Sequence, residues 1–132
     1  MKKMTGSCNC GDIRYEVSGD AKNIVNCHCG LCRKMNGAAF STYVVVLESD
    51  FTLLGGELRT CSVSDNATKS VCRHCATPIL NENPKYKGLT ILYLGSLDEP
   101  EALVPQVNIY CESQVSWLEE VTQLTSLDQG IE

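Results

Sequence analysis

The amino-acid sequence predicts a mainly β fold, made of small antiparallel sheets in one domain. Short stretches rich in β-branched and aromatic residues recur along the chain, and turns that contain glycine, asparagine or aspartate separate them. The 132 residues are enough for one domain with its own core and too few for two. Because no repeat, low-complexity run or linker divides the chain, we expect one domain over residues 1–132.

The first half of the chain contains the clearest strand patterns. Residues 12–18 alternate polar and apolar side chains, as in a half-buried strand. Residues 38–47 are β-branched and aromatic in their second half, which is typical of a buried strand. A short extended segment and two further strands split by Gly55-Gly56 are expected over residues 23–26, 51–54 and 58–63.

The second half adds a strand pattern over residues 89–94 and a shorter one over residues 107–110. Only the tail spaces its apolar residues for a helix, with Trp117, Val121 and Leu124 at positions i, i+4 and i+7. We therefore expect a short C-terminal helix or turn with its tryptophan as a lid over the core. The last residues, 125–132, are expected to be frayed.

The charge and hydropathy of the chain exclude several classes of function. A formal net charge of −5 and a pI near 5.0 leave no cationic face for a phosphate backbone, so we expect no nucleic-acid partner. No window approaches the roughly 20 apolar residues of a membrane span, and no apolar run follows the first lysines as in a signal peptide. We therefore expect a cytoplasmic protein with no membrane partner.

Nine cysteines are many for a chain of this length, and disulfides cannot pair an odd number of them. In the reducing compartment expected here, clustered thiols bind metal more often than they bind one another. Zinc is the expected metal, because it forms tetrahedral sites with thiolate ligands. A secreted disulfide scaffold is the competing interpretation, and both the odd count and the missing signal disfavour it.

The densest cysteine cluster is Cys27-His28-Cys29-Gly30-Leu31-Cys32, a C-x-C-x-x-C motif called here the central triplet. Cysteines two residues apart project from the same face of an extended segment, and a tight turn can carry the third back to them. A zinc ion with Zn–S bonds of roughly 2.3 Å places its sulfur ligands about 3.8 Å apart, which these spacings allow. His28 alternates with two of these ligands and should point away from the metal.

Two further motifs supply four more candidate ligands. They are Cys8-x-Cys10, called here the N-terminal pair, and Cys72-x-x-Cys75, called the knuckle pair, whose inner His74 is expected to be exposed. Cys61 stands alone in a predicted strand and is expected to be a small buried hydrophobe. Seven thiols divide naturally into a closed structural set of four and a set of three with an open corner.

Spacing alone leaves two divisions of these thiols open. In one, the knuckle pair takes Cys27 and Cys29, which strands Cys32. In the other, the knuckle pair takes the N-terminal pair and the central triplet stays together. The second division is more economical, and it would tie the start of the chain to its middle.

The chain resembles the glutathione-dependent formaldehyde-activating enzyme family over residues 6–118. The resemblance rests on these three cysteine motifs and on further positions, namely Arg33-Lys34, Gly95-Ser96-Leu97-Asp98-Glu99-Pro100 and a late tryptophan. The resemblance implies a β-tent fold of small coiled sheets. It also implies carbon–sulfur lyase chemistry, which joins glutathione to formaldehyde as S-hydroxymethylglutathione and reverses that step. The two zinc ions that it implies are a structural ion on Cys8, Cys10, Cys72 and Cys75 and a substrate-facing ion on Cys27, Cys29 and Cys32.

Other positions bear on the substrate. Arg33 follows the third ligand of the triplet and is expected to contact a carboxylate of a glutathione-like thiol, whereas Lys34 is expected to be solvated. Three residues depart from the family pattern: Asn108 stands in place of a histidine, Gln114 in place of an arginine and Ala76 in place of a glycine. Asparagine cannot transfer a proton at neutral pH and glutamine cannot pair with a carboxylate, so the substrate could differ from that of relatives.

Two other functions fit the same motifs. A non-catalytic zinc module would bind another protein through its surface, and a thiol redox or metal-handling protein would use the central triplet as a labile site. The leading hypothesis remains an enzyme in which a substrate thiol takes the open corner of the three-cysteine zinc, is held as a thiolate and attacks a small aldehyde. The sequence leaves the oligomeric state open.

Overall fold

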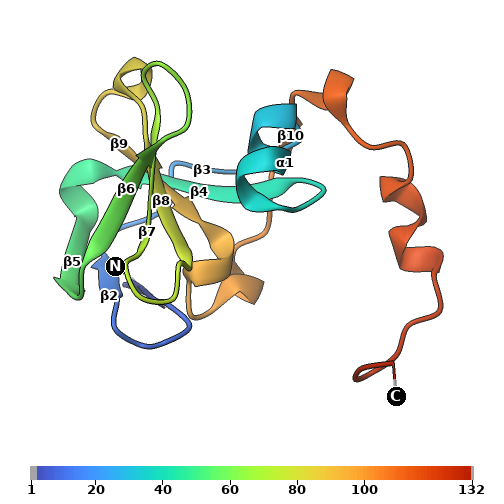
Figure 1. Cartoon of the computed structure of the whole chain (residues 1–132), viewed down its shortest axis with the longest axis horizontal. Coiled ribbons are helices and arrows are strands. Elements are labelled where there is room, and N and C mark those ends of the chain that lie inside the picture. Colours follow the sequence, from blue (N-terminus) through green and yellow to red (C-terminus); the bar gives the residue numbers. More distant parts are fainter. Residues whose placement is uncertain (1–2, 132) are drawn as a thin grey trace.

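The computed structural model describes residues 3–131 and arranges ten strands in two sheets (Figure 1). The smaller sheet has the strand order β1-β2-β5, and the larger sheet has the order β10-β3-β4-β9-β8-β7-β6. The predicted mainly β class is confirmed. The strands are β1 Met4–Ser7, β2 Arg14–Val17, β3 Asn23–Cys27, β4 Ser41–Leu47, β5 Phe51–Gly55, β6 Leu58–Ser62, β7 Thr68–Cys72, β8 Pro78–Glu82, β9 Leu89–Tyr93 and β10 Val107–Ile109.

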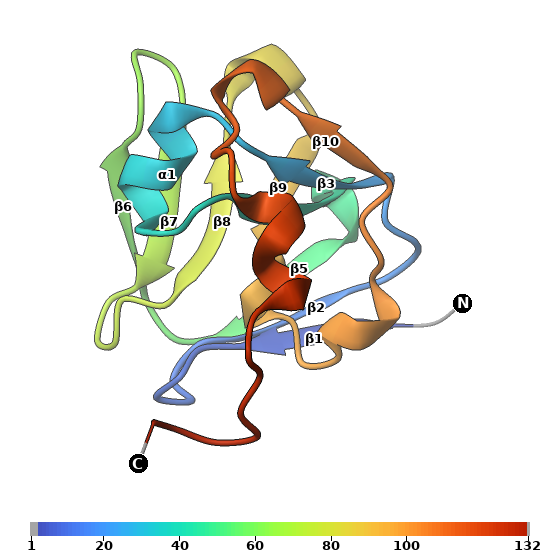
Figure 2. The same cartoon turned by 90° about the vertical axis from the view of Figure 1, so that its right-hand side faces the viewer.

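One pair of strands departs from the predicted antiparallel arrangement. β10 runs parallel to β3, with Val107 opposite Val25 and Ile109 opposite Cys27, and Figure 2 shows the two strands side by side. The other neighbouring strands within residues 3–131 pair antiparallel. The long connection after β9 brings the chain back in the direction of β3, which sets β10 beside the end of the strand that carries Cys27.

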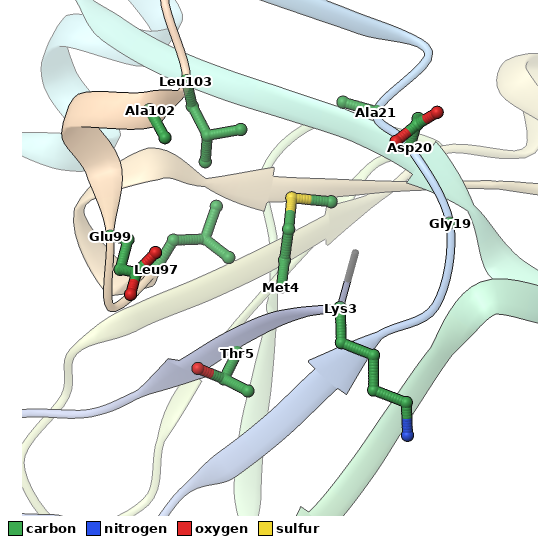
Figure 3. A pocket seen from close by; sticks show the side chains of 10 residues that line it. All are labelled: Lys3, Met4, Thr5, Gly19, Asp20, Ala21, Leu97, Glu99, Ala102 and Leu103. Atoms are coloured by element: carbon green, nitrogen blue, oxygen red, sulfur yellow. The ribbon is translucent and has the colours of Figure 1, made fainter. Parts of the chain in front are cut away.

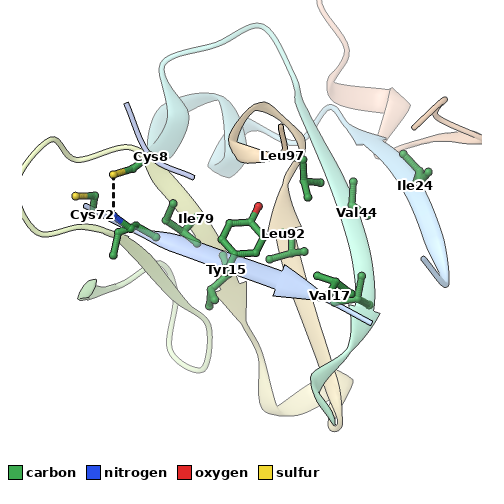
Figure 4. Packing of buried hydrophobic residues seen from close by; sticks show 12 residues of the cluster. Cys8, Tyr15, Val17, Ile24, Val44, Cys72, Ile79, Leu92 and Leu97 are labelled. Carbon is green, nitrogen blue, oxygen red and sulfur yellow. Dashed lines mark hydrogen bonds between the residues drawn. The ribbon is translucent and has the colours of Figure 1, made fainter. Parts of the chain in front are cut away.

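The core forms where β2 packs against the larger sheet (Figure 4). Tyr15 and Val17 alternate along β2 and are buried, as the period of two in a strand requires. They pack in one cluster with Val44 of β4, Ile79 of β8 and Leu92 of β9. The alternating pattern in residues 12–18 was therefore a correct prediction of a half-buried strand.

The segment after β9 fastens the smaller sheet to the larger one. The Tyr15 hydroxyl lies 2.7 Å from the Oγ of Ser96 inside the core. Thr5 and Ser7 on β1 donate hydrogen bonds to the two carboxylate oxygens of Asp98, at 2.8 and 2.7 Å. The Gly-Ser-Leu-Asp stretch singled out in the sequence thus has a structural role at this junction.

A helix occurs where the sequence pattern predicted only a turn. α1 spans Gly30–Asn36, begins after Cys29, whose sulfur accepts a hydrogen bond from the Cys32 N–H, and ends at Gly37 with a left-handed φ of 61°. None of its seven residues is buried, so the sequence lacks the periodic apolar pattern from which a helix is normally predicted. The short 3₁₀ helices are η1 Glu48–Asp50, η2 Pro84–Tyr86, η3 Leu94–Ser96, η4 Pro100–Ala102, η5 Cys111–Ser113 and η6 Leu118–Gln123.

Two predictions of burial are wrong. Cys61 is exposed, because it lies on β6 at the edge of the larger sheet, where most residues face solvent. Trp117 is 50 % exposed and joins none of the core clusters, because the tail leaves the body after η5 and does not cover the core. Within residues 3–131, the structure contains no helix that is both long enough and apolar enough to span a membrane.

Candidate metal centres

The structure brings the N-terminal pair and the knuckle pair together. The Sγ atoms of Cys8, Cys10, Cys72 and Cys75 all lie within 4.8 Å of one another. The Cys8–Cys10 and Cys10–Cys72 sulfur distances are 3.5 and 3.8 Å, close to the spacing of about 3.8 Å for tetrahedral zinc ligands. This set of four thiols fits a zinc ion. It corresponds to the more economical of the two divisions of the cysteines, in which the knuckle pair joins the N-terminal pair.

Two tight turns shape this four-thiol cluster. After β1, the N–H of Gly11 donates to the carbonyl of Cys8, and Gly11 adopts a φ of 84°. After β7, the N–H of Ala76 donates to the carbonyl of Cys72, and Ala76 adopts a φ of 64°. Backbone N–H groups of Ile13 and Cys75 point at sulfur atoms of the cluster, which favours the thiolate form that a metal requires.

The left-handed conformation of Ala76 gives a stability prediction. Ala76→Gly should raise the free energy of unfolding by about 1 kcal/mol, because the alanine Cβ is strained at positive φ and glycine is not. Urea unfolding of the zinc-loaded chain measures the change. Ala102→Gly, in the 3₁₀ helix η4, is the matched control and should lower stability by about 0.5–1 kcal/mol. Equal losses at both positions would contradict the prediction.

The structure also brings the central triplet together. Cys27 ends β3, Cys29 precedes α1 and Cys32 lies in its first turn, so a strand end and a helix start converge. The sulfur of Cys27 lies 3.6 Å from that of Cys29 and 3.4 Å from that of Cys32. The hydrogen bond from Cys32 lowers the pKa of the Cys27 thiol to about 6, against the opposing effect of burial. The three thiols fit three ligand positions of a zinc ion.

A network of hydrogen bonds among largely buried polar side chains holds the sulfur of Cys32 in place. The Tyr43 hydroxyl donates to the Cys32 sulfur at 3.1 Å, and the Asn36 amide nitrogen lies 3.3 Å from that hydroxyl and 2.7 Å from the Oγ of Ser41. The Nζ of Lys69 donates to the side-chain oxygen of Asn36 and to the carbonyl of Met35, both at 2.7 Å. These contacts fix the end of α1, where a positive charge is favourable.

Lys69 connects the two thiol clusters. It lies on β7, three residues before Cys72, while its buried ammonium group holds the helix that carries Cys32. Burial lowers the pKa of Lys69, and the ring of Tyr93 lies 5.4 Å from its Nζ. The role of Lys69 is not evident from the sequence pattern, because a lysine in a strand usually faces solvent.

On the other side of the triplet, Asn108 joins β10 to β3. Its Oδ1 lies 3.1 Å from the amide nitrogen of Asn26 and 3.2 Å from the Nε2 of His28. The His28 side chain is buried and packs on Phe40, with 5.1 Å between ring centroids, so it turns toward β10 and lies outside the thiol cluster. Asn108 therefore has a structural role at this position. The expected orientation of His28 is confirmed, as is the exposure of His74.

Arg33 holds the start of the C-terminal segment. Its Nη1 donates to the carbonyl of His28 at 3.0 Å and to the carbonyl of Ser113 in η5. The half-buried Gln114 follows η5, and the exposed Cys111 begins it. Cys111 was overlooked in the sequence because it belongs to none of the three cysteine motifs. The predicted contact of Arg33 with a substrate carboxylate stays a prediction.

The surface formed by residues 3–131 includes two hollows. One, of about 270 Å³, opens beside β1 and the loop after β2, with Met4, Leu97 and Leu103 on its walls (Figure 3). The other, of about 390 Å³, is a cleft that no cysteine lines, although its walls include residues close to each thiol cluster. On one side Asn36 and Ser41 line it, and on the other Thr77, whose Oγ1 lies 3.2 Å from the Cys75 sulfur. Its remaining lining residues are Ala38, Phe40, Thr42, Pro78, Tyr93, Leu94, Gly95 and Ser96, so it carries no charged side chain.

Comparisons with known proteins identify the fold and the family of the chain. A crystal structure of a Rhodobacter sphaeroides protein superposes with a TM-score of 0.64 at 20 % identity, covering 80 % of this chain and 99 % of that one, which shows a shared fold. A Halomonas elongata protein named provisionally as a glutathione-dependent formaldehyde-activating enzyme is 22 % identical over 125 residues, 88 % of this chain and 80 % of its own length. The family model described as glutathione-dependent formaldehyde-activating enzyme matches residues 3–113, which include both thiol clusters. The chain therefore belongs to the glutathione-dependent formaldehyde-activating enzyme family.

Proposed function

We propose that this chain is a zinc-dependent carbon–sulfur lyase that forms and breaks the adduct of a small-molecule thiol, such as glutathione, with formaldehyde or another small aldehyde. Cys27, Cys29 and Cys32 form its reactive site, and the four-thiol cluster holds a structural zinc. The observation that carries this proposal is the unequal number of ligands. Within residues 3–131, no fourth histidine, cysteine or carboxylate joins the central triplet, whereas the other cluster is complete.

The reaction needs only modest help from the protein. Addition of a thiol to an aldehyde forms one C–S bond and moves one proton from sulfur to the carbonyl oxygen, so it needs neither an oxidant nor a reductant. Zinc held by three thiolates supplies a fourth position at which a thiol is favoured as thiolate. This makes a reducing compartment such as the cytoplasm the fitting location, because all three cysteines must stay reduced.

Residues around the triplet would orient the ligands and the substrate. The Tyr43 hydroxyl, held by Asn36, fixes the sulfur of Cys32. Asn36 and Ser41 belong both to this network and to the uncharged cleft, which suits a small neutral aldehyde better than a charged group. Arg33 is the proposed contact for a carboxylate of the thiol, because it follows Cys32 on α1 and is only half-buried.

Removing one thiol of the triplet tests the proposal. Cys29→Ser should lower zinc content from two ions per chain to one, and should reduce catalysed exchange of glutathione with its formaldehyde adduct by about 100-fold or more. Elemental analysis measures the metal, and NMR exchange measured above the spontaneous rate gives the activity. Cys61→Ser, at an exposed cysteine outside both clusters, is the matched control and should change neither quantity. Unchanged metal content and exchange in Cys29→Ser would contradict the proposal.

Cobalt substitution distinguishes the enzyme from a non-catalytic zinc module. Glutathione added to the cobalt-loaded chain should change the absorption of the second site, because a thiol would enter its open position. A spectrum that glutathione leaves unchanged would indicate a closed site and favour a protein-binding module.

A further inference from the structure

The C-terminal arm, defined here as residues 116–131, exposes apolar side chains without covering any part of the body. In Figure 1 it leaves β10 and η5 and stands apart from the two sheets, and in Figure 2 it passes in front of them. Every residue of the arm except Leu118 is exposed. Its large exposed apolar residues are Trp117, Val121, Leu124, Leu127 and Ile131. Single exposed apolar residues are ordinary, but a gathering of this kind marks an interaction surface.

The root of the arm is fixed. β10 pairs with β3, the N–H of His28 donates to the carbonyl of Ile109, and Arg33 binds the carbonyl of Ser113. Two backbone hydrogen bonds then close η5, from Ser113 to Tyr110 and from Gln114 to Cys111. These contacts direct the arm away from the core of its own chain, so its apolar side chains are presented outward.

The charges of the chain are distributed unevenly, and this indicates what covers the arm. All eleven lysines and arginines lie at or before Lys87, together with eight of the sixteen acidic residues, so residues 1–87 carry a net charge of +3. Residues 88–132 contain the other eight acidic residues and no basic one, which gives them a net charge of −8. The arm itself carries three of these acidic residues, Glu119, Glu120 and Asp128, and no basic one, so it is complementary in charge to the part of the body formed by residues 1–87.

The body exposes apolar residues on the same element as a basic residue or on a neighbouring one. Leu31 and Lys34 are exposed three residues apart on α1, where side chains at that spacing share a face. Leu54, on β5, is exposed one residue before Gly55, which pairs with the exposed Arg14 of β2. An apolar and acidic segment fits surfaces of this composition.

We propose that the arm of one copy packs on the body of a second copy, and that the two arms exchange in a two-fold symmetric dimer. A closed two-fold arrangement covers both arms with one kind of contact and leaves no further arm to recruit a third chain. The proposal is independent of the reaction, because none of the arm residues belongs to a thiol cluster.

The single tryptophan makes the arm directly observable. For the zinc-loaded full chain, sedimentation should give twice the 14.4 kDa chain mass at high protein concentration, with a shift toward monomer on dilution and on addition of salt. Trp117 emission should shift to shorter wavelength, and iodide quenching of it should decrease, over the same concentration range in which the dimer forms.

Two substitutions on the arm give a matched pair. Leu124→Asp should raise the dimer dissociation constant by at least about 10-fold, because it places a charge in the apolar contact. Thr122→Asp adds the same charge at an exposed polar position of the arm. It should change the dimer dissociation constant by less than about 3-fold. A parent chain that stays monomeric at all concentrations would overturn the proposal. This holds if Trp117 is then exposed to iodide, and equally if it is protected by the body of its own chain or by another protein. Equal effects of the two substitutions would also overturn it.

Discussion

Cys72→Ser is expected to destabilise the chain most, with a loss of about 4 kcal/mol or more in the free energy of unfolding of the zinc-loaded protein. Cys72 is fully buried at the end of β7, and its cluster joins that strand to the turn after β1. Serine is a poor zinc ligand, so the cross-link between two distant parts of the chain would be lost. Chelator-treated parent protein should lose stability by a similar amount.

Urea unfolding and zinc analysis on the same samples check this result. The control is Cys61→Ser, which makes the same atomic change on the exposed edge strand β6 and should alter stability by less than about 0.5 kcal/mol. If Cys72→Ser unfolded at the same urea concentration as the parent, the four-thiol cluster would have no structural role.

Gly6→Ala is expected to cost about 3 kcal/mol or more, although it adds only one methyl group. A Cβ on Gly6 would lie 2.1 Å from the Cζ atom of Tyr15, well inside van der Waals contact. The Tyr15 ring cannot easily move away, because it is buried in the core and its hydroxyl pairs with Ser96. Overpacking and loss of that hydrogen bond therefore add together.

Gly55→Ala is the matched control for this substitution. Gly55 also lies in the smaller sheet, and a Cβ added there meets no atom within 4 Å. Its urea midpoint should stay within the change expected of a surface substitution, about 0.5 kcal/mol. Similar urea midpoints for Gly6→Ala and Gly55→Ala would contradict this prediction, because they would mean that the Tyr15 ring can move aside for the added methyl group.

Features set by near neighbours in the chain were predictable from the sequence. The three cysteines of the central triplet lie within six residues. A single turn of the chain, between the strand that ends at Cys27 and the helix that contains Cys32, is enough to bring them together. The strands with clear alternation or β-branched runs, such as β2 and β4, were predicted for the same reason. The β1, β7 and β8 strands were not predicted: β1 is four residues long, β7 contains a lysine and a serine that only the fold buries, and β8 begins at a proline.

Features set by distant parts of the chain were not predictable in the same way. Spacing could not decide between two partners for the knuckle pair, because the choice depends on how β1 and β7 meet in the fold. Lys69 looked like a surface lysine, and only the packing of α1 on β4 and β7 shows why it is buried. Cys61 was misplaced because its strand lies at a sheet edge, which the sequence pattern of one strand does not reveal.

The parallel pairing of β10 with β3 has a consequence for how the chain assembles during synthesis. The four-thiol cluster joins residues 62 positions apart and can close once Cys75 has been made, whereas the contact of His28 with Asn108 spans 80 positions and waits for β10. A contact can form during synthesis only after its C-terminal residue has been made. A nascent chain can thus bring the four thiols of the first cluster together while the β10 side of the central triplet is still missing, so the triplet is enclosed only on a body that already contains the other cluster.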